Sequence, residues 1–230
     1  PKYLEAYAEI KRLARVEGKP LIYDIDDLLL ELPPDHPDRK TNFYIDSLLP
    51  ILQAIIDADA VTTTTPALAN YIRAFNKNVF VNPNYLNDQI WRLLPVKKPA
   101  PSNKKMIIGY MGSETHEYDV EFIAPVLLAL NQKFQNQLQF RFWGVKPPIE
   151  LQNLSNVEWL PLALYNYREF AHYFQDQHAD IFIAPLRDNL FNQCKSGIKF
   201  LEYNSLGAPG VFSAVGAYQN IVDQGVNGFL

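Results

Sequence analysis

The chain has 230 residues, of which 48% are hydrophobic and 20% are charged, with a formal net charge of -4. These values predict folded domains and argue against disorder and against sequence-independent nucleic-acid binding, which needs a positive surface. The single cysteine excludes an intrachain disulfide and is typical of a reducing, cytoplasmic compartment. No apolar run approaches the ~20 residues of a membrane-spanning helix.

The first part of the chain, residues 1–100, predicts a small domain of strands and helices. Helices are expected over 4–16, 45–57 and 66–75, and strands over 21–23, 60–65 and 79–81. Three strands are few for a sheet covered on both faces. Since the chain also begins at Pro1 instead of methionine, we expect a piece of a longer protein that continues beyond both ends.

A polar, proline-rich segment over 95–103 is expected to link this part to a second domain over 105–230. Strand patterns there occupy 106–110, 138–142, 157–160, 181–184 and 211–213. Helix patterns lie around 123–130, where Pro125 delays or kinks the helix, and over 167–174, 199–206 and 219–224. This alternation predicts an α/β fold with a parallel sheet and helices on both faces.

The most informative group of polar residues follows the apolar strand 181–184. Lys195 and Lys199 are four residues apart, so a single helix would present both on one side, and Glu202 lies three residues further on. Because helix N-termini attract anions and a carboxylate accepts from hydroxyls, Lys195, Ser196, Lys199 and Glu202 favour a nucleotide-sugar site. The alternative is a solvated helix face with an ordinary Lys–Glu pair.

Gly112 and Ser113 follow the first strand of the second domain. Glycine lets the backbone approach a phosphate, and ligands of open parallel sheets bind beyond the carboxyl ends of the strands. The alternative is a tight structural turn. His116 comes next in this loop, where a lone histidine is more often a surface residue, and Cys194 is assigned no role because no histidine lies close in sequence.

Three carboxylates crowd the end of the strand at 21–23: Asp24, Asp26 and Asp27. Like charges this close are unfavourable without a cation or a catalytic role. They fit a metal-binding Asp-x-Asp, an acceptor-side loop beside a nucleotide-sugar cleft, or solvated acids with Asp27 capping a helix. They also fit a haloacid dehalogenase-like phosphatase that uses Asp24 and Asp26 with magnesium, although Leu28 stands where that superfamily usually has Thr or Val.

Together these segments resemble glycosyltransferases of the GT-B fold, the large group of retaining enzymes called glycosyl transferases group 1. The resemblance covers nearly the whole chain. It rests on a strand ending in acids (19–27), an Ala-Asp-x-Val-like strand (59–65), a Pro-Asn-Gly-like crossing (80–84), the opening strand of the second domain (107–112), the nucleotide-sugar region (179–185 and 199–207) and a glycine-containing stretch (215–230).

The resemblance implies two Rossmann-like domains, the first one incomplete, and transfer of a sugar from a nucleoside-diphosphate donor to a hydroxyl without a metal or other cofactor. Glu202 matches the second of two family glutamates, the one that binds the ribose hydroxyls, and Cys194 stands where the first of the two is expected. Asp26 replaces the family histidine that contacts the donor sugar. Lys195, Ser196, Lys199, Gly112 and Ser113 would hold the donor.

The biological role implied is cell-envelope or extracellular polysaccharide synthesis in the cytoplasm. The acceptor would be a sugar or a lipid-linked sugar, with peripheral membrane contact possible and no nucleic-acid partner. Two alternatives stay open: the magnesium-dependent phosphatase, and a module that binds nucleotide sugars without catalysis.

Overall fold

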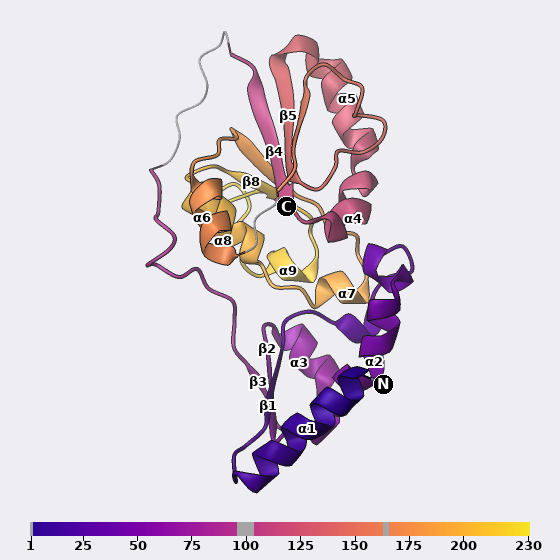
Figure 1. Cartoon of the computed structure of the whole chain (residues 1–230). Helices are drawn as coiled ribbons and strands as arrows, with labels where there is room; N and C mark the ends of the chain where they lie inside the picture. The colour runs from indigo at the N-terminus through magenta and orange to yellow at the C-terminus, as the bar shows by residue number, and fades with distance from the viewer. Residues whose placement is uncertain (1, 96–103, 163–165) are drawn as a thin grey trace. The chain divides into compact units, whose positions relative to one another are not determined.

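The computed structural model describes residues 2–95, 104–162 and 166–230 (Figure 1). The chain divides into two compact units: unit 1 comprises Pro1–Asn84 and Asp188–Ser196, and unit 2 comprises Tyr85–Arg187 and Gly197–Leu230. These units differ from the predicted domains, 1–100 and 105–230, because a segment from late in the sequence packs with the first unit. The predicted linker falls mostly on residues 96–103, outside the described residues.

Unit 1 contains a parallel sheet in the order β1-β2-β3, formed by Ile22–Ile25, Ala60–Thr63 and Val79–Val81. Tyr23 lies opposite Val61, which in turn lies opposite Val79. The helices that alternate with these strands are α1 (Lys2–Val16), α2 (Asn42–Asp57) and α3 (Pro66–Ile72), with short 3-10 turns at Leu29–Glu31 and Pro37–Lys40.

Local sequence explains where the helices of unit 1 begin. The hydroxyls of Thr41 and Thr65 accept from the backbone N–H of the third residue of α2 and of α3, which satisfies a donor that each helix leaves open. The buried core then joins apolar side chains of the sheet with those of α2 and α3, including Val61, Ile55 and Leu68. Phe191 and Cys194, from the segment Asp188–Ser196, belong to this same core.

Unit 2 contains a second parallel sheet, in the order β6-β5-β4-β7-β8. Its strands are Met106–Gly112 (β4), Leu138–Gly144 (β5), Val157–Leu160 (β6), Ile181–Ala184 (β7) and Gly210–Phe212 (β8). The chain leaves β4 for strands on one side and returns later to the other side. Strand order therefore reverses at β4, which is where open α/β sheets bind ligands.

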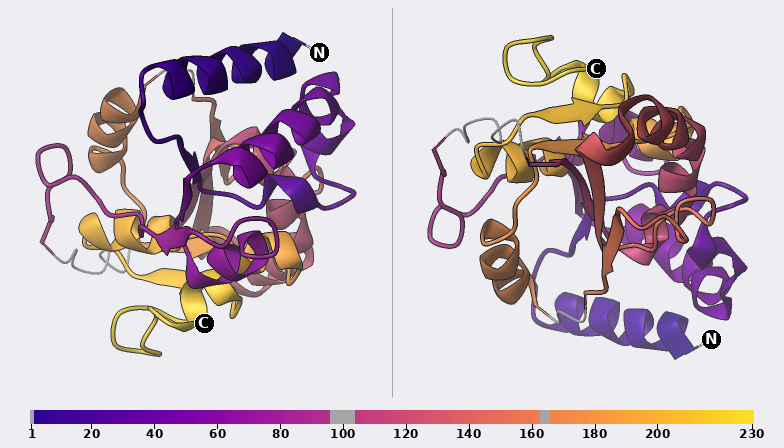
Figure 2. Two further views of the ribbon diagram at one scale, coloured as in Figure 1. Left: turned by 90° about the horizontal axis from the view of Figure 1, so that it is seen from below. Right: turned by 90° about the horizontal axis from the view of Figure 1, so that it is seen from above.

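Helices cover both faces of this sheet, as the alternation of strand and helix predicts. In Figures 1 and 2, α4 (Glu117–Phe122) and α5 (Ala124–Phe134) lie on the side of β4 and β5 opposite to α6 (Tyr167–Gln175). The strand side chains divide accordingly: Tyr110 and Phe142 pack in the core that contains Leu127 of α5, while Met111 and Trp143 pack in the core that contains Phe174 of α6.

Three short helices remain: α7 (Leu190–Gln193), α8 (Ile198–Ser205) and α9 (Gly216–Gln219). Gly207 follows α8 with φ +66°, in agreement with the prediction that it ends that helix. The helix predicted over 219–224 is wrong. The side chain of Asn227 accepts from the backbone N–H of Asp223 (2.7 Å), and Gly225 has φ +76°, so this stretch folds as a turn after α9.

Candidate functional site

A pocket of about 700 Å³ lies in unit 2. It lies beyond the carboxyl ends of β4 and β5, where Gly112 and Gly144 line it, and continues to Pro161 after β6. The start of α8 supplies Ile198, Lys199 and Glu202. The other described lining residues are Met111, Ser113, Glu114, Thr115, His116, Leu162, Asn166, Tyr167 and Phe170.

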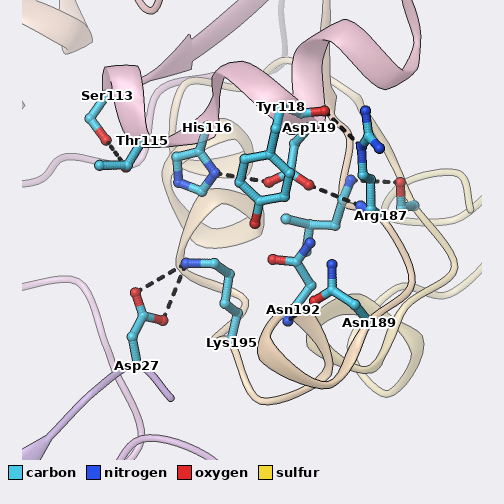
Figure 3. Close-up of polar contacts among 12 residues, drawn as sticks. Asp27, Ser113, Thr115, His116, Tyr118, Asp119, Arg187, Asn189, Asn192 and Lys195 are labelled. Carbon is cyan, nitrogen blue, oxygen red and sulfur yellow. Dashed lines mark hydrogen bonds and ion pairs between the residues drawn. The ribbon is translucent and has the colours of Figure 1, made fainter. Parts of the chain in front are cut away.

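The exit of β4 forms a tightly built side of the pocket. A Cβ on Gly112 would lie 2.6 Å from the hydroxyl oxygen of Tyr110, so only glycine fits beside this buried ring. The carbonyl of Gly112 accepts from Val145 N–H at 2.8 Å, which ties the exits of β4 and β5 together. Ser113 Oγ and Thr115 Oγ1 hydrogen-bond at 2.6 Å (Figure 3). The hydroxyls of Ser113 and Thr115 are thus held together at this side of the pocket.

The start of α8 brings a cation and a carboxylate to the same pocket. Lys199 Nζ lies 5.8 Å from the centroid of the Tyr110 ring. The Glu202 side chain is buried, with the residue 5% exposed, and burial raises its pKa to about 7 while the positive charge of Lys199 opposes this rise. Ligand hydroxyls that donate to the Glu202 carboxylate would therefore favour its charged form.

The remaining wall of the pocket is largely apolar. Tyr167 and Phe170 come from α6, with their ring centroids 6.1 Å apart, and the Tyr167 hydroxyl accepts from Trp91 Nε1 at 2.9 Å. The part of the pocket wall that α6 supplies is therefore aromatic.

His116 also lines the pocket, contrary to the expectation of a surface residue. Its side chain is 14% exposed, and its Nδ1 lies 3.3 Å from Oδ2 of Asp119, whose side chain is 0% exposed. The other oxygen of Asp119 accepts from Arg187 N–H at 2.9 Å, beyond the end of β7 (Figure 3). The three-residue spacing of His116 and Asp119, directly after a glycine-ended strand, is the sequence signal that could have indicated this pair.

Lys195 and Ser196 occupy a different place from the one expected. The prediction that Lys195 and Lys199 share one side of a helix is wrong, because α7 ends at Gln193 and α8 begins only at Ile198. A Cβ on the intervening Gly197 would lie 2.2 Å from Ile221, and the chain turns there instead of continuing a helix. In unit 1, Lys195 Nζ pairs with Asp27 at 3.0 Å, and Ser196 Oγ accepts from Asn84 Nδ2 at 3.0 Å.

The acids after β1 have separate surroundings. Asp24 accepts from the Thr62 hydroxyl, Asp26 is exposed while its backbone carbonyl accepts from Thr64 Oγ1 (2.9 Å), and Asp27 pairs with Lys195. The alternative in which Asp27 caps a helix is wrong, because Leu28 is the N-cap of the turn that follows and makes no side-chain cap. In the described part of the chain, no group of three or more His, Cys, Asp or Glu is arranged to hold a metal ion.

Cys194 is a core residue of unit 1. It is 1% exposed, and burial, followed by the negative charge of Asp27, raises the pKa of its thiol to about 11. Its carbonyl accepts from Thr65 Oγ1 at 2.8 Å. Because the thiolate is the reactive form, a raised pKa makes Cys194 a weak nucleophile, in keeping with the absence of an assigned role.

Two α/β units with parallel sheets, one of them with a pocket at its strand-order reversal, define a fold of the GT-B glycosyltransferase class. Residues 105–230 match the family described as glycosyl transferases group 1, and the chain belongs to that family. No curated protein matches the chain in sequence. Among the described residues, no helix is both long enough and apolar enough to span a membrane.

Solved structures share this fold at low sequence identity. The crystal structure of TarM has a TM-score of 0.60 and 15% identity, with 93% of this chain covering 40% of TarM. The catalytic domain of starch synthase IV from Arabidopsis thaliana, bound to ADP and acarbose, has a TM-score of 0.51 and 11% identity over 96% of this chain and 62% of that domain. An α,α-trehalose-phosphate synthase (UDP-forming) from Burkholderia vietnamiensis has a TM-score of 0.52 and 11% identity, and the match covers 94% of this chain and 65% of that enzyme.

Proposed function

We propose that this chain acts in the transfer of a sugar from a nucleoside-diphosphate donor to a hydroxyl acceptor, with the donor bound in the pocket of unit 2. The observation that carries the proposal is the meeting of Lys199 and Glu202 with Gly112 and Ser113 around one pocket of about 700 Å³. That volume is in the range of small-molecule sites, and the pocket lies where parallel sheets bind ligands.

Each of these residues has a distinct role in the proposal. The Lys199 ammonium neutralises the diphosphate, which is the leaving group, and Glu202 accepts from the ribose hydroxyls. Gly112 and Ser113 allow the phosphates to approach the backbone and a hydroxyl. Stabilising the charge that develops on a leaving diphosphate accelerates its departure, and the proposal requires no metal ion or other cofactor.

The finer parts of the proposal rest on the sequence resemblance. They are a catalytic role for Asp26, donor contacts from Lys195 and Ser196, a hexose as the transferred sugar, a sugar or lipid-linked acceptor, and cytoplasmic synthesis of envelope or extracellular polysaccharide. A second TarM structure, from S. aureus, contains UDP and α-GlcNAc-glycerol, and the starch synthase domain contains ADP. UDP and ADP are therefore the first nucleotides to test, with GDP as a third.

Isothermal titration calorimetry of the chain with UDP, ADP and GDP tests the proposal. We expect one of them to bind, and we expect Lys199→Met to weaken it by about tenfold or more, because a charge-assisted contact is lost. Lys133→Met is the matched control, because Lys133 also lies over an aromatic ring, that of Phe134, but does not line the pocket. Failure of all three nucleotides to bind would refute the proposal.

The role of Glu202 is tested with a nucleotide that lacks the ribose hydroxyls. The wild-type chain should bind the 2′,3′-dideoxy form of its nucleotide more weakly than the ribo form, whereas Glu202→Gln should bind the two with similar affinity. Glu121→Gln, at an exposed position of α4, should keep the wild-type preference. If Glu202→Gln still binds the ribo form more tightly than the dideoxy form, Glu202 does not recognise the ribose hydroxyls.

The two alternatives give different results. The phosphatase requires magnesium-dependent release of phosphate from simple phosphate esters and loss of that activity in Asp24→Asn. A binding module without catalysis would bind the nucleotide and its sugar donor but would not release free nucleotide from the donor. Membership of the glycosyl transferases group 1 family favours the transferase over the phosphatase.

A further inference from the structure

The pair formed by His116 and Asp119 is held from several sides. His116 ends a 3-10 turn (Glu114–His116), and Asp119 lies one turn further on, in α4. The fully buried Asp119 carboxylate contacts His116 Nδ1 through Oδ2 and the Arg187 backbone N–H through Oδ1. Arg187 Nε also donates to the Tyr118 carbonyl at 2.9 Å, and its guanidinium carbon lies 5.6 Å from the centroid of the Phe122 ring. The position of the Asp119 carboxylate is therefore set by α4, which carries it, and by Arg187 after β7, which donates to it.

This geometry determines how the imidazole of His116 is presented. When the Asp119 carboxylate is ionised it only accepts hydrogen bonds, and Nδ1 then carries the hydrogen in the contact between the two side chains. The second ring nitrogen, Nε2, lies on the side of the ring away from Asp119 (Figure 3). His116 lines the pocket together with Ser113 and Lys199.

The charges around the pocket indicate what this histidine would bind. Among the described lining residues, Lys199 is the only Lys or Arg, whereas Glu114 and Glu202 are both acids. A single ammonium beside two carboxyl groups provides little net attraction for a diphosphate. An imidazole that carries hydrogens on both ring nitrogens is positively charged, so it can donate to an anionic ligand through the nitrogen that faces away from Asp119.

We infer that His116 is a further ligand-contacting residue, which donates from Nε2 to an anionic phosphate oxygen of the nucleotide, and that Asp119 is the positioning residue that holds its ring. The inference rests on the proposed function, because it requires the nucleotide to bind in this pocket. It adds a second cationic donor, next to Lys199, for the departing diphosphate.

The chain contains a matched control for this pair. His178 Nε2 lies 3.4 Å from Asp180 Oδ1, with the histidine side chain 45% exposed. Both residues precede β7, so they lie at the amino end of the sheet, whereas the pocket is at its carboxyl end. His178→Gln therefore changes a histidine paired with an aspartate in the same unit without touching the pocket.

Calorimetry with the bound nucleoside diphosphate, its monophosphate and its nucleoside tests the contact. We expect His116→Gln to lower the affinity for the diphosphate by roughly tenfold to a hundredfold, which is the usual effect of losing a charge-assisted hydrogen bond. The affinity of His116→Gln for the nucleoside should stay within about twofold of the wild-type value. His178→Gln should bind all three ligands with the wild-type affinity. Equal loss for diphosphate and nucleoside, or no loss at all, would overturn the inference.

The positioning role of Asp119 has to be tested with a measurement that general destabilisation of the fold would not change in the same way. The chain has four histidines, so their ring nitrogens are resolvable by ¹⁵N NMR, and His116→Gln identifies the His116 signals. We expect the Nε2 signal to shift on addition of the diphosphate but not of the nucleoside. In Asp119→Asn the ring should change its tautomer balance and the diphosphate affinity should fall, with nucleoside affinity retained.

Two failures are distinguishable. If no nucleoside diphosphate binds the wild-type chain, the proposed function and this inference both fail. If a diphosphate binds but His116→Gln binds it equally well, or the Nε2 signal does not respond, only the inference fails. Should Asp119→Asn not fold, His116→Gln and the NMR titration of the wild type still decide the contact.

Discussion

At the scale of single residues, the buried carboxyl group of Glu202 makes the stability of the chain depend on pH. Its folded-state pKa of about 7 lies above the ordinary value of 4.5 because the side chain is buried. The folded state is thus more stable with the Glu202 carboxyl group protonated than with it ionised. Its contribution to stability is complete below about pH 4.5 and is lost as the pH rises through 7.

We therefore expect the free energy of unfolding of the wild type to fall relative to that of Glu202→Gln between pH 5 and pH 8. The shift from 4.5 to about 7 corresponds to at most roughly 3 kcal/mol. Urea unfolding of both proteins at several pH values measures the difference. A difference that does not change with pH would show that Glu202 is not buried in solution as it is in the structure.

A second residue-scale prediction concerns Tyr110 and Gly112. The Tyr110 hydroxyl is buried and has no hydrogen-bond partner among the described residues, so Tyr110→Phe should raise the free energy of unfolding by about 1 kcal/mol. Gly112→Ala should lower it by roughly 1 to 3 kcal/mol, since the new Cβ would lie 2.6 Å from that hydroxyl. In a chain that already carries Tyr110→Phe, Gly112→Ala should lower the free energy of unfolding by less than it does in the wild type. If the effects of the two substitutions simply add, the proposed clash is contradicted.

At the scale of elements, the segment Asp188–Ser196 is unusual because it packs with unit 1 although its sequence neighbours belong to unit 2. Phe191 is buried in the core of unit 1, with its ring 5.4 Å from that of His36 in an edge-on contact. Lys195 adds an ion pair to Asp27 and lies 4.4 Å from the centroid of the Phe191 ring. The chain therefore passes between the two units before and after this segment.

We expect the Asp27–Lys195 pair to hold this segment in place. Lys195→Met and Asp27→Asn should each speed amide hydrogen exchange in 188–196, and the double variant should show a coupling of about 1 kcal/mol, because the pair is partly buried. Arg12→Gln, which breaks the exposed pair with Glu9, is the control and should leave exchange in 188–196 unchanged. Faster exchange spread evenly over unit 1 would instead indicate general destabilisation.

At the scale of the whole molecule, the arrangement of parallel strands explains why residues distant in sequence line one pocket. The carboxyl ends of β4 and β5 lie at the same edge of the sheet as the loop that precedes α8, because all strand pairs in unit 2 are parallel. A ligand there contacts the exit of the first strand and a helix about 85 residues later in the chain, a spacing that follows from this topology.

Nucleotide binding should accordingly protect unit 2 locally. At a ligand concentration of about 100 times Kd, binding stabilises the folded state by about 2.7 kcal/mol. We expect hydrogen exchange to slow at 112–117 and at the start of α8, with β1, β2 and β3 unchanged. Protection confined to unit 1, or found nowhere, would place the nucleotide outside the pocket.

Much of the fold could be predicted from local pattern. The strands at 157–160 and 181–184 and the helix that Gly207 ends follow from apolar periodicity and from glycine conformation, which depend on near neighbours. Positions just after strands also indicated four residues that the structure brings to one pocket: Gly112, Ser113, Lys199 and Glu202. Their roles in binding stay proposals. Helix geometry alone was misleading for Lys195, because the packing of Gly197 against Ile221 ends the regular spacing.

The sequence by itself thus determined the α/β class, most of the alternating strands and helices, and the edge of the sheet where ligands are expected, because hydrophobic periodicity and turn residues act over a few positions. Only the tertiary structure decided that Lys195 pairs with Asp27, that 188–196 packs with unit 1, and that the Asp119 carboxylate accepts from Arg187 N–H. These features depend on contacts between segments distant in sequence or on burial, and neither is encoded in local spacing.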